Sequence, residues 1–482
     1  MRPVILRAKP VNAIVGNPPW ITYNKTQAVV REELERQSKE RYQIWDGGRY
    51  ATQQDIAGMF FARCVELYLE PGGRAGMVLP HSALQTGQYR KWRAGKWGVL
   101  SVDLGVRRPW DLDRIEPNDF FPVPSCVAFL TRKDPPGKPL PRQADSWRGN
   151  HGGPFTKEPV QLTDTSGEYA SPYGERARNG ATIYPRPLFF VNEEASTALV
   201  QAANTVSVSP RRSAQEKSPW KELELPDLVG SVIEADHVYD IHLGETVAPY
   251  MLLQPLRAVL PLSKSTGQLV KSEDGWYDVD PLSLGERMRR RWRVTNELWD
   301  DNKGTNNELS LLENVDYMRK LSAQNMRFDA KSGVLYGASG QPTAVAYAQL
   351  NAVVDHSLFW LETESLDEAR YLVTTINSQK LSNLLKPLMP KGQFGARHVH
   401  KHLWRLPIPE YDDSDSLHVE IAQAGEDAAA GAKVLWDEIR AEREDKGQST
   451  SVTVARREIR KWLSESSEGQ RVEELVGRLL GG

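Results

Sequence analysis

Apolar residues in the first third of the chain follow two different periods. Residues 12–16 form a short apolar run that ends in glycine, which predicts a strand. Between residues 51 and 70 the apolar positions instead share one face of a helix; they are Ile56, Met59, Phe60, Cys64 and Leu67. We expect Pro71-Gly72-Gly73 to end this helix, and residues 75–80 predict a buried strand.

Three further elements continue this alternation. Residues 84–96 favour a second helix, residues 99–104 a short strand, and residues 123–131 a final strand. Strands that alternate with helices form βα units on a largely parallel sheet. The sequence therefore predicts an α/β domain over residues 1–133.

Composition divides the rest of the chain into three regions. Residues 134–180 are rich in Pro, Gly, Ser and charge, which favours a linker or surface loops. Residues 181–415 predict a mixed α/β domain without a detectable repeat, and Asp367 to Leu385 reads as an amphipathic helix within it. Residues 416–482 predict a helical C-terminal region, with one or two terminal helices between Arg456 and Leu480.

The residues that follow the first predicted strand, Asn17-Pro18-Pro19-Trp20, place a polar and an aromatic side chain on a stiff loop. Each proline fixes its own φ and holds the preceding residue extended. The Asn17 side-chain oxygen and the Pro18 carbonyl could both accept hydrogen bonds from the exocyclic amine of a base, drawing its lone pair out of the ring. Trp20 could stack on a base that is flipped out of the duplex. The alternative is a rigid turn packed by an exposed tryptophan.

On these residues the chain resembles the amino-methylating DNA methyltransferases, specifically the adenine-N6 type with an Asn-Pro-Pro-aromatic motif. It is most similar to large bacterial restriction-modification enzymes that fuse methylation and target recognition in one polypeptide. The resemblance implies a partial Rossmann-like methyltransferase sheet, S-adenosylmethionine as the methyl donor, and a catalytic role for Asn17, Pro18, Pro19 and Trp20. It extends to residues 55–80, the strand around Cys126, and residues 180–186, 392–398 and 406–409.

One motif of this family has no counterpart in the chain. The family binds S-adenosylmethionine on a Gly-rich loop, Asp-x-x-x-Gly-x-Gly, which in this order of motifs precedes the catalytic tetrapeptide. Neither Asp46-Gly47-Gly48 nor the glycines at 333, 337 and 340 substitute for it. We therefore expect this chain alone to bind the cofactor weakly or not at all, and a missing or separate polypeptide to supply the cofactor-binding half. A natural truncation, a cloned fragment and a split enzyme are all compatible with this pattern.

Basic residues are segregated along the chain, although its net charge is only −2. One cluster surrounds Trp292 and consists of Arg287, Arg289, Arg290, Arg291 and Arg293. A second cluster consists of Lys391, Arg397, His398, His400, Lys401, His402 and Arg405. We expect both to lie on one side of the recognition domain and to contact the phosphates of double-stranded DNA; a solvated charged surface is the alternative. The terminal helices are expected to pack against the recognition domain rather than to clamp DNA.

Other features exclude several classes of protein. No apolar run approaches the roughly 18 residues of a membrane helix, and the N-terminus does not resemble a signal peptide. Cys64 and Cys126 lie in apolar elements, which favours buried thiols, and no metal-ligand spacing is found. We expect a cytoplasmic protein without a metal site.

Three functions are compatible with the sequence. The first is an adenine-N6 DNA methyltransferase of a restriction-modification or phage-defence system, active when its cofactor-binding part is supplied. The second is a non-catalytic DNA-recognition remnant or subunit of such a system. The third is methylation of another amine or amide, in protein or RNA. The extent of the predicted target-recognition region, residues 181–415, favours DNA over the third function.

Overall fold

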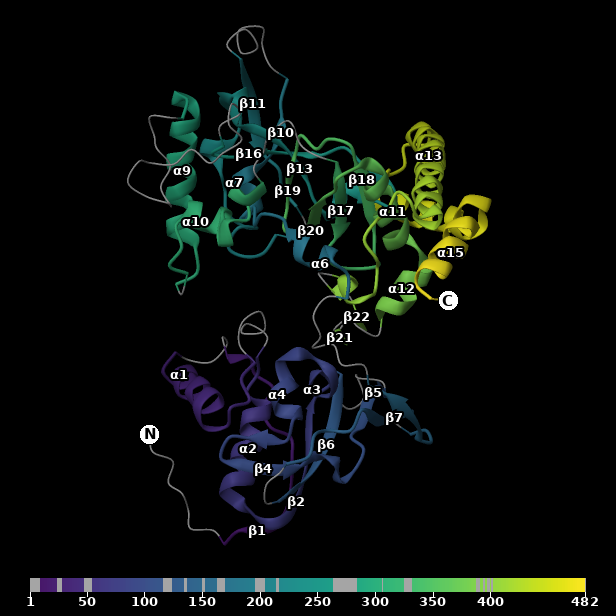
Figure 1. Cartoon of the computed structure of the whole chain (residues 1–482). Coiled ribbons are helices and arrows are strands. Elements are labelled where there is room, and N and C mark those ends of the chain that lie inside the picture. The colour runs from purple at the N-terminus through teal and green to yellow at the C-terminus, as the bar shows by residue number, and fades with distance from the viewer. Residues whose placement is uncertain are drawn as a thin grey trace. The chain divides into compact units, whose positions relative to one another are not determined.

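A computed structural model gives the coordinates of the chain. It describes residues 9–23, 28–46, 54–115, 124–133, 137–149, 152–162, 170–195, 204–213, 216–262, 284–305, 307–324, 332–386, 391–392, 395–396, 399 and 402–481. The chain forms two compact units. The first comprises residues 1–168 and 388–397, and the second comprises residues 169–387 and 398–482 (Figure 1).

The first unit contains an eight-stranded mixed sheet in the order β1-β2-β6-β5-β7-β8, with β4 beside β6 and β3 beside β4. The strands are β1 (Val11–Gly16), β2 (Leu69–Pro80), β3 (Lys96–Trp97), β4 (Leu100–Asp103), β5 (Trp110–Ile115), β6 (Ser125–Arg132), β7 (Gln143–Gly149) and β8 (Thr156–Gln161). Among the described strands of this sheet, only β1–β2 and β5–β7 are parallel pairs. The expectation of a largely parallel sheet is therefore wrong. A parallel neighbour needs a long crossover, whereas tight hairpins such as β3–β4 and β7–β8 produce antiparallel pairs.

Two helices precede β2. They are α1 (Ala28–Arg36) and α2 (Ala57–Tyr68). The second packs Met59, Phe61 and Val65 into the same apolar core as the inward side chains of β2 and β6. It ends at Tyr68, before the predicted stop at Pro71-Gly72-Gly73, because Leu69 is already extended at φ −92° and ψ 128°.

The outcome for the other predicted elements of this unit is mixed. The strands predicted at residues 75–80, 99–104 and 123–131 are confirmed within β2, β4 and β6. Phe60, expected on the buried face of α2, is 39% exposed, because the sheet packs against a face turned toward Phe61.

Residues 84–96 do not form the single helix that was predicted. They divide into α3 (Ser82–Gln85), the 3₁₀ turn η4 (Gly87–Tyr89), α4 (Arg90–Arg93) and the start of β3. Thr86 is extended at φ −83° and ψ 156°, which interrupts the helix. The Trp92 and Trp97 rings are both buried and stack with centroids 5.5 Å apart, so their packing reverses the chain at this point.

The predicted linker also differs from the structure. Residues 134–180 contribute β7 and β8, which extend the sheet beyond β5. The Trp147 ring meets Trp110 of β5 edge to face, with centroids 5.4 Å apart, and Ala144 is fully buried. These long-range aromatic contacts stabilise β7 and β8, whose polar composition does not predict strands from the sequence alone.

The second unit contains two larger sheets. The six-stranded sheet has the order β12-β11-β10-β16-β13-β19, and the four-stranded sheet has the order β18-β17-β20-β9. Their strands are β9 (Arg178–Asn179), β10 (Phe190–Glu193), β11 (Thr205–Pro210), β12 (Ser231–Glu234), β13 (Val238–His242), β16 (Leu256–Val259), β17 (Gly333–Gly337), β18 (Ala344–Tyr347), β19 (Val353–Val354) and β20 (Leu358–Glu362). The helix α9 (Glu286–Asn302) packs beside β12, and its Trp299 ring stacks on Trp220 at 5.8 Å. The predicted mixed α/β class is confirmed.

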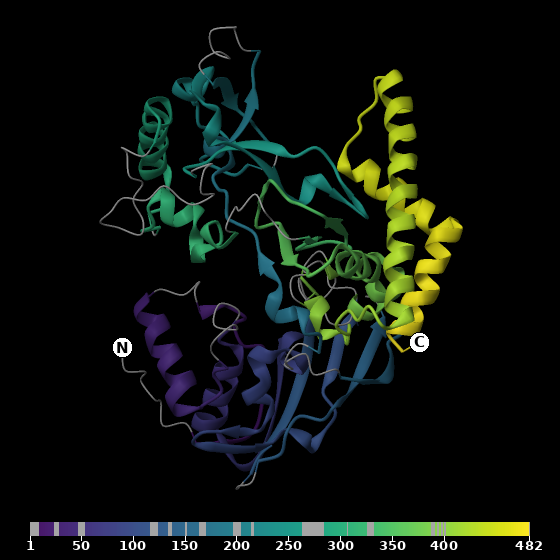
Figure 2. The same ribbon diagram turned by 45° about the horizontal axis from the view of Figure 1, so that its top comes forward.

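Helices complete the C-terminal part of this unit (Figures 1 and 2). They are α11 (Leu366–Asn377), α12 (Gln379–Leu385), α13 (Ser416–Asp445), α14 (Val452–Glu465) and α15 (Ser467–Leu479). The long helix α13 lies so close to α11 that a Cβ on Gly425 would be 2.0 Å from Thr374 Oγ1. Arg456 of α14 donates to the carbonyl of Val247 at 2.9 Å. The expected packing of the terminal helices on the preceding domain is confirmed.

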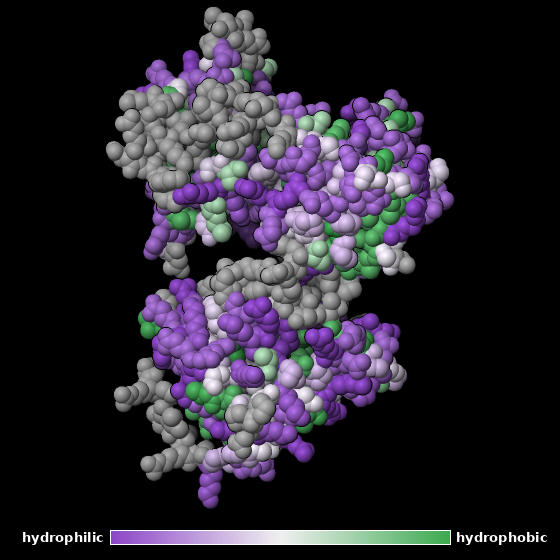
Figure 3. Space-filling model, viewed as in Figure 1, coloured by the Kyte–Doolittle hydropathy of each residue, from purple (hydrophilic) through white to green (hydrophobic). Residues whose placement is uncertain are grey.

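Among the described residues, separate clusters of buried hydrophobic side chains lie in the two units, one in the first unit and two in the second. On the face seen in Figure 3 the described residues are mostly hydrophilic, and the apolar areas are small. Within the described ranges, no helix has the length and apolar character to cross a membrane. Both cysteines are free thiols; Cys126 is buried and Cys64 is half-buried.

Candidate functional site

The predicted catalytic loop leaves the sheet directly after β1. Because β1 and β2 are parallel, with Gly16 opposite Met77, the loop lies at the edge where β2 ends. Asn17 is exposed and Pro18 is buried, whereas Trp20 is half-buried. The Trp20 ring packs partly against the core of the first unit, and its Nε1 donates to the Val78 carbonyl at 3.4 Å. The loop thus carries an exposed amide side chain and, three residues later, a tryptophan that is anchored to the sheet.

A second segment holds the chain that follows the loop. The Tyr23 amide donates to the Gln54 carbonyl at 3.1 Å, and the Ile56 amide donates to the Ile21 carbonyl at 3.0 Å. These bonds form a short bridge between Thr22 and Asp55. The start of α2 therefore fixes the exit of the loop, so the tetrapeptide is held at both ends.

Asp55 is the centre of a hydrogen-bond network beside this bridge. Its carboxylate accepts from the Tyr89 hydroxyl at 2.5 Å, from the Ala57 amide at 3.0 Å and from Gln88 Nε2 at 3.4 Å. Burial raises the pKa of Asp55 to about 6, and the three hydrogen bonds oppose a larger rise. Sequence analysis missed this network because the side-chain partners Gln88 and Tyr89 are more than 30 residues from Asp55 and meet it only in the fold.

A close histidine–aspartate contact lies at the same edge of the sheet. His81, which follows β2, has its Nε2 3.2 Å from Asp111 Oδ1. Asp111 is opposite Cys126 of β6, and Cys126 is opposite Leu79 of β2, so the pair spans three neighbouring strands. The sequence offered one signal for His81, a polar residue directly after a predicted strand. It offered none for Asp111.

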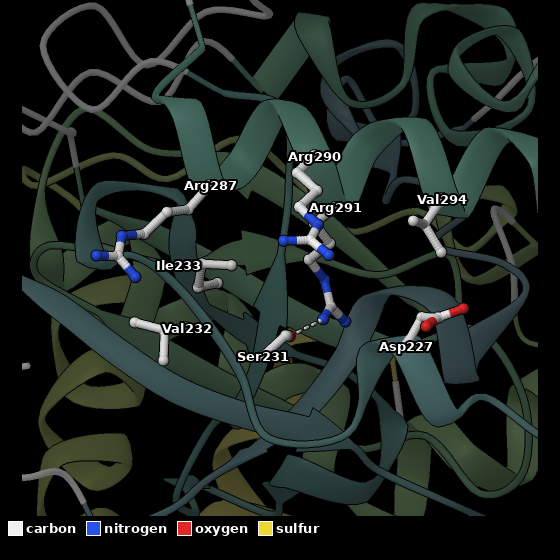
Figure 4. A pocket seen from close by; sticks show the side chains of 8 residues that line it. All are labelled: Asp227, Ser231, Val232, Ile233, Arg287, Arg290, Arg291 and Val294. Carbon is white, nitrogen blue, oxygen red and sulfur yellow. Dashed lines mark hydrogen bonds between the residues drawn. The ribbon is translucent and has the colours of Figure 1, made fainter.

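The first basic cluster lies on α9 and is not uniformly exposed. Arg287, Arg290 and Arg293 are exposed, whereas Arg291 is only 4% exposed. Arg289 is half-buried and donates to the Leu284 carbonyl at 3.2 Å. Three of the five, Arg287, Arg290 and Arg291, line a pocket of about 340 Å³ between α9 and β12 (Figure 4). The five arginines therefore differ in exposure, and their contact with the phosphates of double-stranded DNA stays a prediction.

The second basic cluster does not form one site in the described structure. Arg397, His398, His400 and Lys401 lie outside the described residues. Lys391 begins the two-residue strand β21 (Lys391–Gly392), which pairs with β22 (Gly395–Ala396) and belongs to the first unit. His402 and Arg405 belong to the second unit, in the 3₁₀ turn η12 (His402–Arg405). The expectation that the whole cluster belongs to the recognition domain is therefore wrong, because the chain crosses between the units inside the cluster.

No fit to the implied cofactor is found in the described part of the first unit. S-adenosylmethionine would need a strand that leads through a glycine loop into a helix beside Asn17. The described neighbour of β1 is β2 alone, and Val15 of β1 is 88% exposed. Among the described residues, no group of three or more His, Cys, Asp or Glu side chains could hold a metal ion.

Comparison with known proteins gives limited similarity over the whole chain. No curated protein matches the sequence. The type IIG restriction endonuclease BpuSI has 13% sequence identity and a TM-score of 0.28, covering 98% of this chain and 54% of its own. The DrdV–DNA complex has 9% identity and a TM-score of 0.40, covering 88% of this chain and 44% of its own.

A third structure, the ATP-dependent Type ISP restriction-modification enzyme LlaBIII bound to DNA, has 9% identity and a TM-score of 0.39, covering 87% of this chain and 29% of its own. The chain thus spans about half or less of the length of these proteins.

A family match covers the part of the chain that contains the loop, α2 and β2. Residues 8–96 match the Eco57I restriction-modification methylase family.

Proposed function

We propose that this chain carries the catalytic loop and the target-recognition region of a site-specific adenine-N6 DNA methyltransferase. Such an enzyme would act in a restriction-modification or phage-defence system and would use S-adenosylmethionine. The observation that carries the proposal is Asn17-Pro18-Pro19-Trp20, held at the end of β1 inside the segment that matches a restriction-modification methylase.

The local chemistry supports transfer to an exocyclic amine. Asn17 and the Pro18 carbonyl are neutral acceptors, so they can bind the two amine hydrogens without taking up a proton. Trp20 is half-buried and is anchored to Val78 through its Nε1, and the exposed part of its ring would stack on a flipped base. The chain's own residues therefore bind and orient the adenine.

The described residues offer no glycine loop beside Asn17. We propose that another polypeptide or a segment outside the described residues supplies the cofactor site. The same observation favours the second candidate function, a DNA-recognition subunit that no longer transfers methyl groups. In both cases double-stranded DNA is the partner.

Expression of the native gene locus in a host without adenine methylation tests the proposal. We expect sequencing of the host DNA to find N6-methyladenine at one recurring sequence. Asn17→Ala should abolish the modification, and Asn12→Ala should preserve it because Asn12 is an exposed residue of β1, outside the loop. Modification that persists in Asn17→Ala would refute the catalytic assignment. Unmodified DNA in the wild type, with duplex binding retained by the purified chain, would establish the non-catalytic alternative.

A further inference from the structure

The pocket beside α9 combines positive charge with unsatisfied hydrogen-bond donors. Figure 4 shows three arginines pointing from α9 toward β12. Apolar side chains form part of the wall, and one carboxylate, Asp227, lies on the lining. The complete lining consists of Asp227, Ser231, Val232, Ile233, Arg287, Arg290, Arg291 and Val294. The lining thus contains three guanidinium groups and one carboxyl group.

Arg291 is the unusual member of this set. Its Nη1 donates to Ser231 Oγ at 2.6 Å, but its Nε and Nη2 are buried and have no hydrogen-bond partner. Burial lowers the pKa of Arg291 to about 10, so the group still carries its charge at neutral pH. Buried charges in proteins are normally paired because leaving them unpaired is costly. An acceptor that enters the pocket would satisfy both free donors.

The nearby carboxylates do not neutralise the pocket. Glu234 accepts from the backbone amides of Arg287 at 3.0 Å and Met288 at 2.9 Å, so it caps the start of α9. Asp227 is exposed, and within the described ranges it makes no ion pair with Arg291, whose pKa is shifted by burial alone. The pocket therefore keeps an excess of positive charge.

We propose that this pocket binds a phosphate group, with Arg291 and Ser231 at its base and Arg287 and Arg290 at its mouth. A guanidinium fork matches two phosphate oxygens, and the apolar wall of Val232, Ile233 and Val294 strengthens the attraction by excluding water. The source we favour is a phosphodiester of duplex DNA, and this choice rests on the proposed function. A free nucleotide or inorganic phosphate offers the same chemistry.

The exposed arginines provide the first test because their replacement leaves the core intact. The purified full chain is titrated with a 30-base-pair duplex at several salt concentrations. We expect Arg287→Gln/Arg290→Gln to weaken binding about tenfold or more and to reduce the slope of log affinity against log salt by about one. Lys433→Gln/Lys461→Gln removes the same charge from exposed positions on α13 and α14 and should change neither quantity. An equal effect of both double variants would overturn the pocket as a site.

Chemical protection distinguishes the two sources of phosphate. Arg287 and Arg290 are modified with phenylglyoxal, and the modified positions are mapped by mass spectrometry. Protection by duplex DNA supports the backbone phosphate, whereas protection by AMP or inorganic phosphate alone supports a free phosphate compound. If none of them protects, the pocket does not bind phosphate. Loss of adenine methylation in Asn17→Ala is scored separately, so failure of the pocket and failure of the proposed methyl transfer are distinguishable.

Discussion

The loop after β1 and the pocket beside α9 present polar groups to a ligand in opposite ways. The loop offers neutral acceptors on a backbone held by two prolines and by bonds to residues 54–56. The pocket offers cations, one of which is buried at 4% exposure with two unsatisfied donors. Neutral groups can orient a reacting amine at any salt concentration, whereas cations that contact DNA phosphates provide affinity that falls with salt, because they release counterions from the DNA. The proposed orientation of a base and the proposed attraction of a phosphate can therefore be tested separately.

Replacement of Asn17 is expected to have the largest effect, and it should affect methyl transfer without affecting DNA binding. With the cofactor-binding part supplied, Asn17→Ala should reduce single-turnover methyl transfer by about a hundredfold or more, similar to loss of one preorganised hydrogen-bonding group at other active sites. The salt slope of DNA binding should stay at its wild-type value. A changed slope with normal turnover would assign Asn17 to phosphate contact instead.

Trp20 tests whether the ring contributes by stacking. Trp20→Ala should weaken capture of a flipped base by about 1–3 kcal/mol, measured by the fluorescence of 2-aminopurine at the target position. Trp20→Phe keeps a stacking ring but loses the Nε1 bond to Val78. If the two variants lose the same affinity, the ring anchors the loop and does not stack.

The Asp55 network beside the loop should make the unfolding free energy depend on pH. Its pKa of about 6 lies above the ordinary value, so the folded state binds this proton more tightly than the unfolded state. The stabilisation is therefore present below about pH 4 and is lost as the pH rises through 6, by about 3 kcal/mol in all and by about 2 kcal/mol between pH 4.5 and 7.5. Asp55→Asn should remove this decline, measured by urea unfolding at pH 4.5 and 7.5. An unchanged pH dependence would contradict the shifted pKa.

Replacement of Arg291 has the smallest expected effect on the free energy of unfolding. It also tests whether a residue of the pocket serves a ligand rather than the fold. Arg291→Met removes a buried cation with unsatisfied donors, so the free protein should gain about 1 kcal/mol of unfolding free energy. Duplex affinity should fall at the same time, as measured by fluorescence anisotropy. A variant that loses both stability and affinity would show that Arg291 supports the fold rather than a ligand.

Local signals in the sequence were sufficient for the loop and for several elements. The prolines and the preceding apolar run predicted a rigid loop after residue 16, and β1 ends there. The helical period from Asp367 to Leu385 was also informative, although Ser378 divides it by accepting from the Leu381 amide and beginning α12. Each of these features depends on residues within one or two turns of one another.

The pairing of the strands and the burial of individual charged side chains were decided only by the tertiary structure. The strands β7 and β8 depend on contacts such as Trp110 with Trp147, which composition does not reveal. The five arginines of the first cluster look alike in sequence, yet only Arg291 is buried against Ser231. Hydrophobic period and turn chemistry act between near neighbours and can be read along the chain. Strand pairing and desolvation of a charge depend on residues that only the fold brings together.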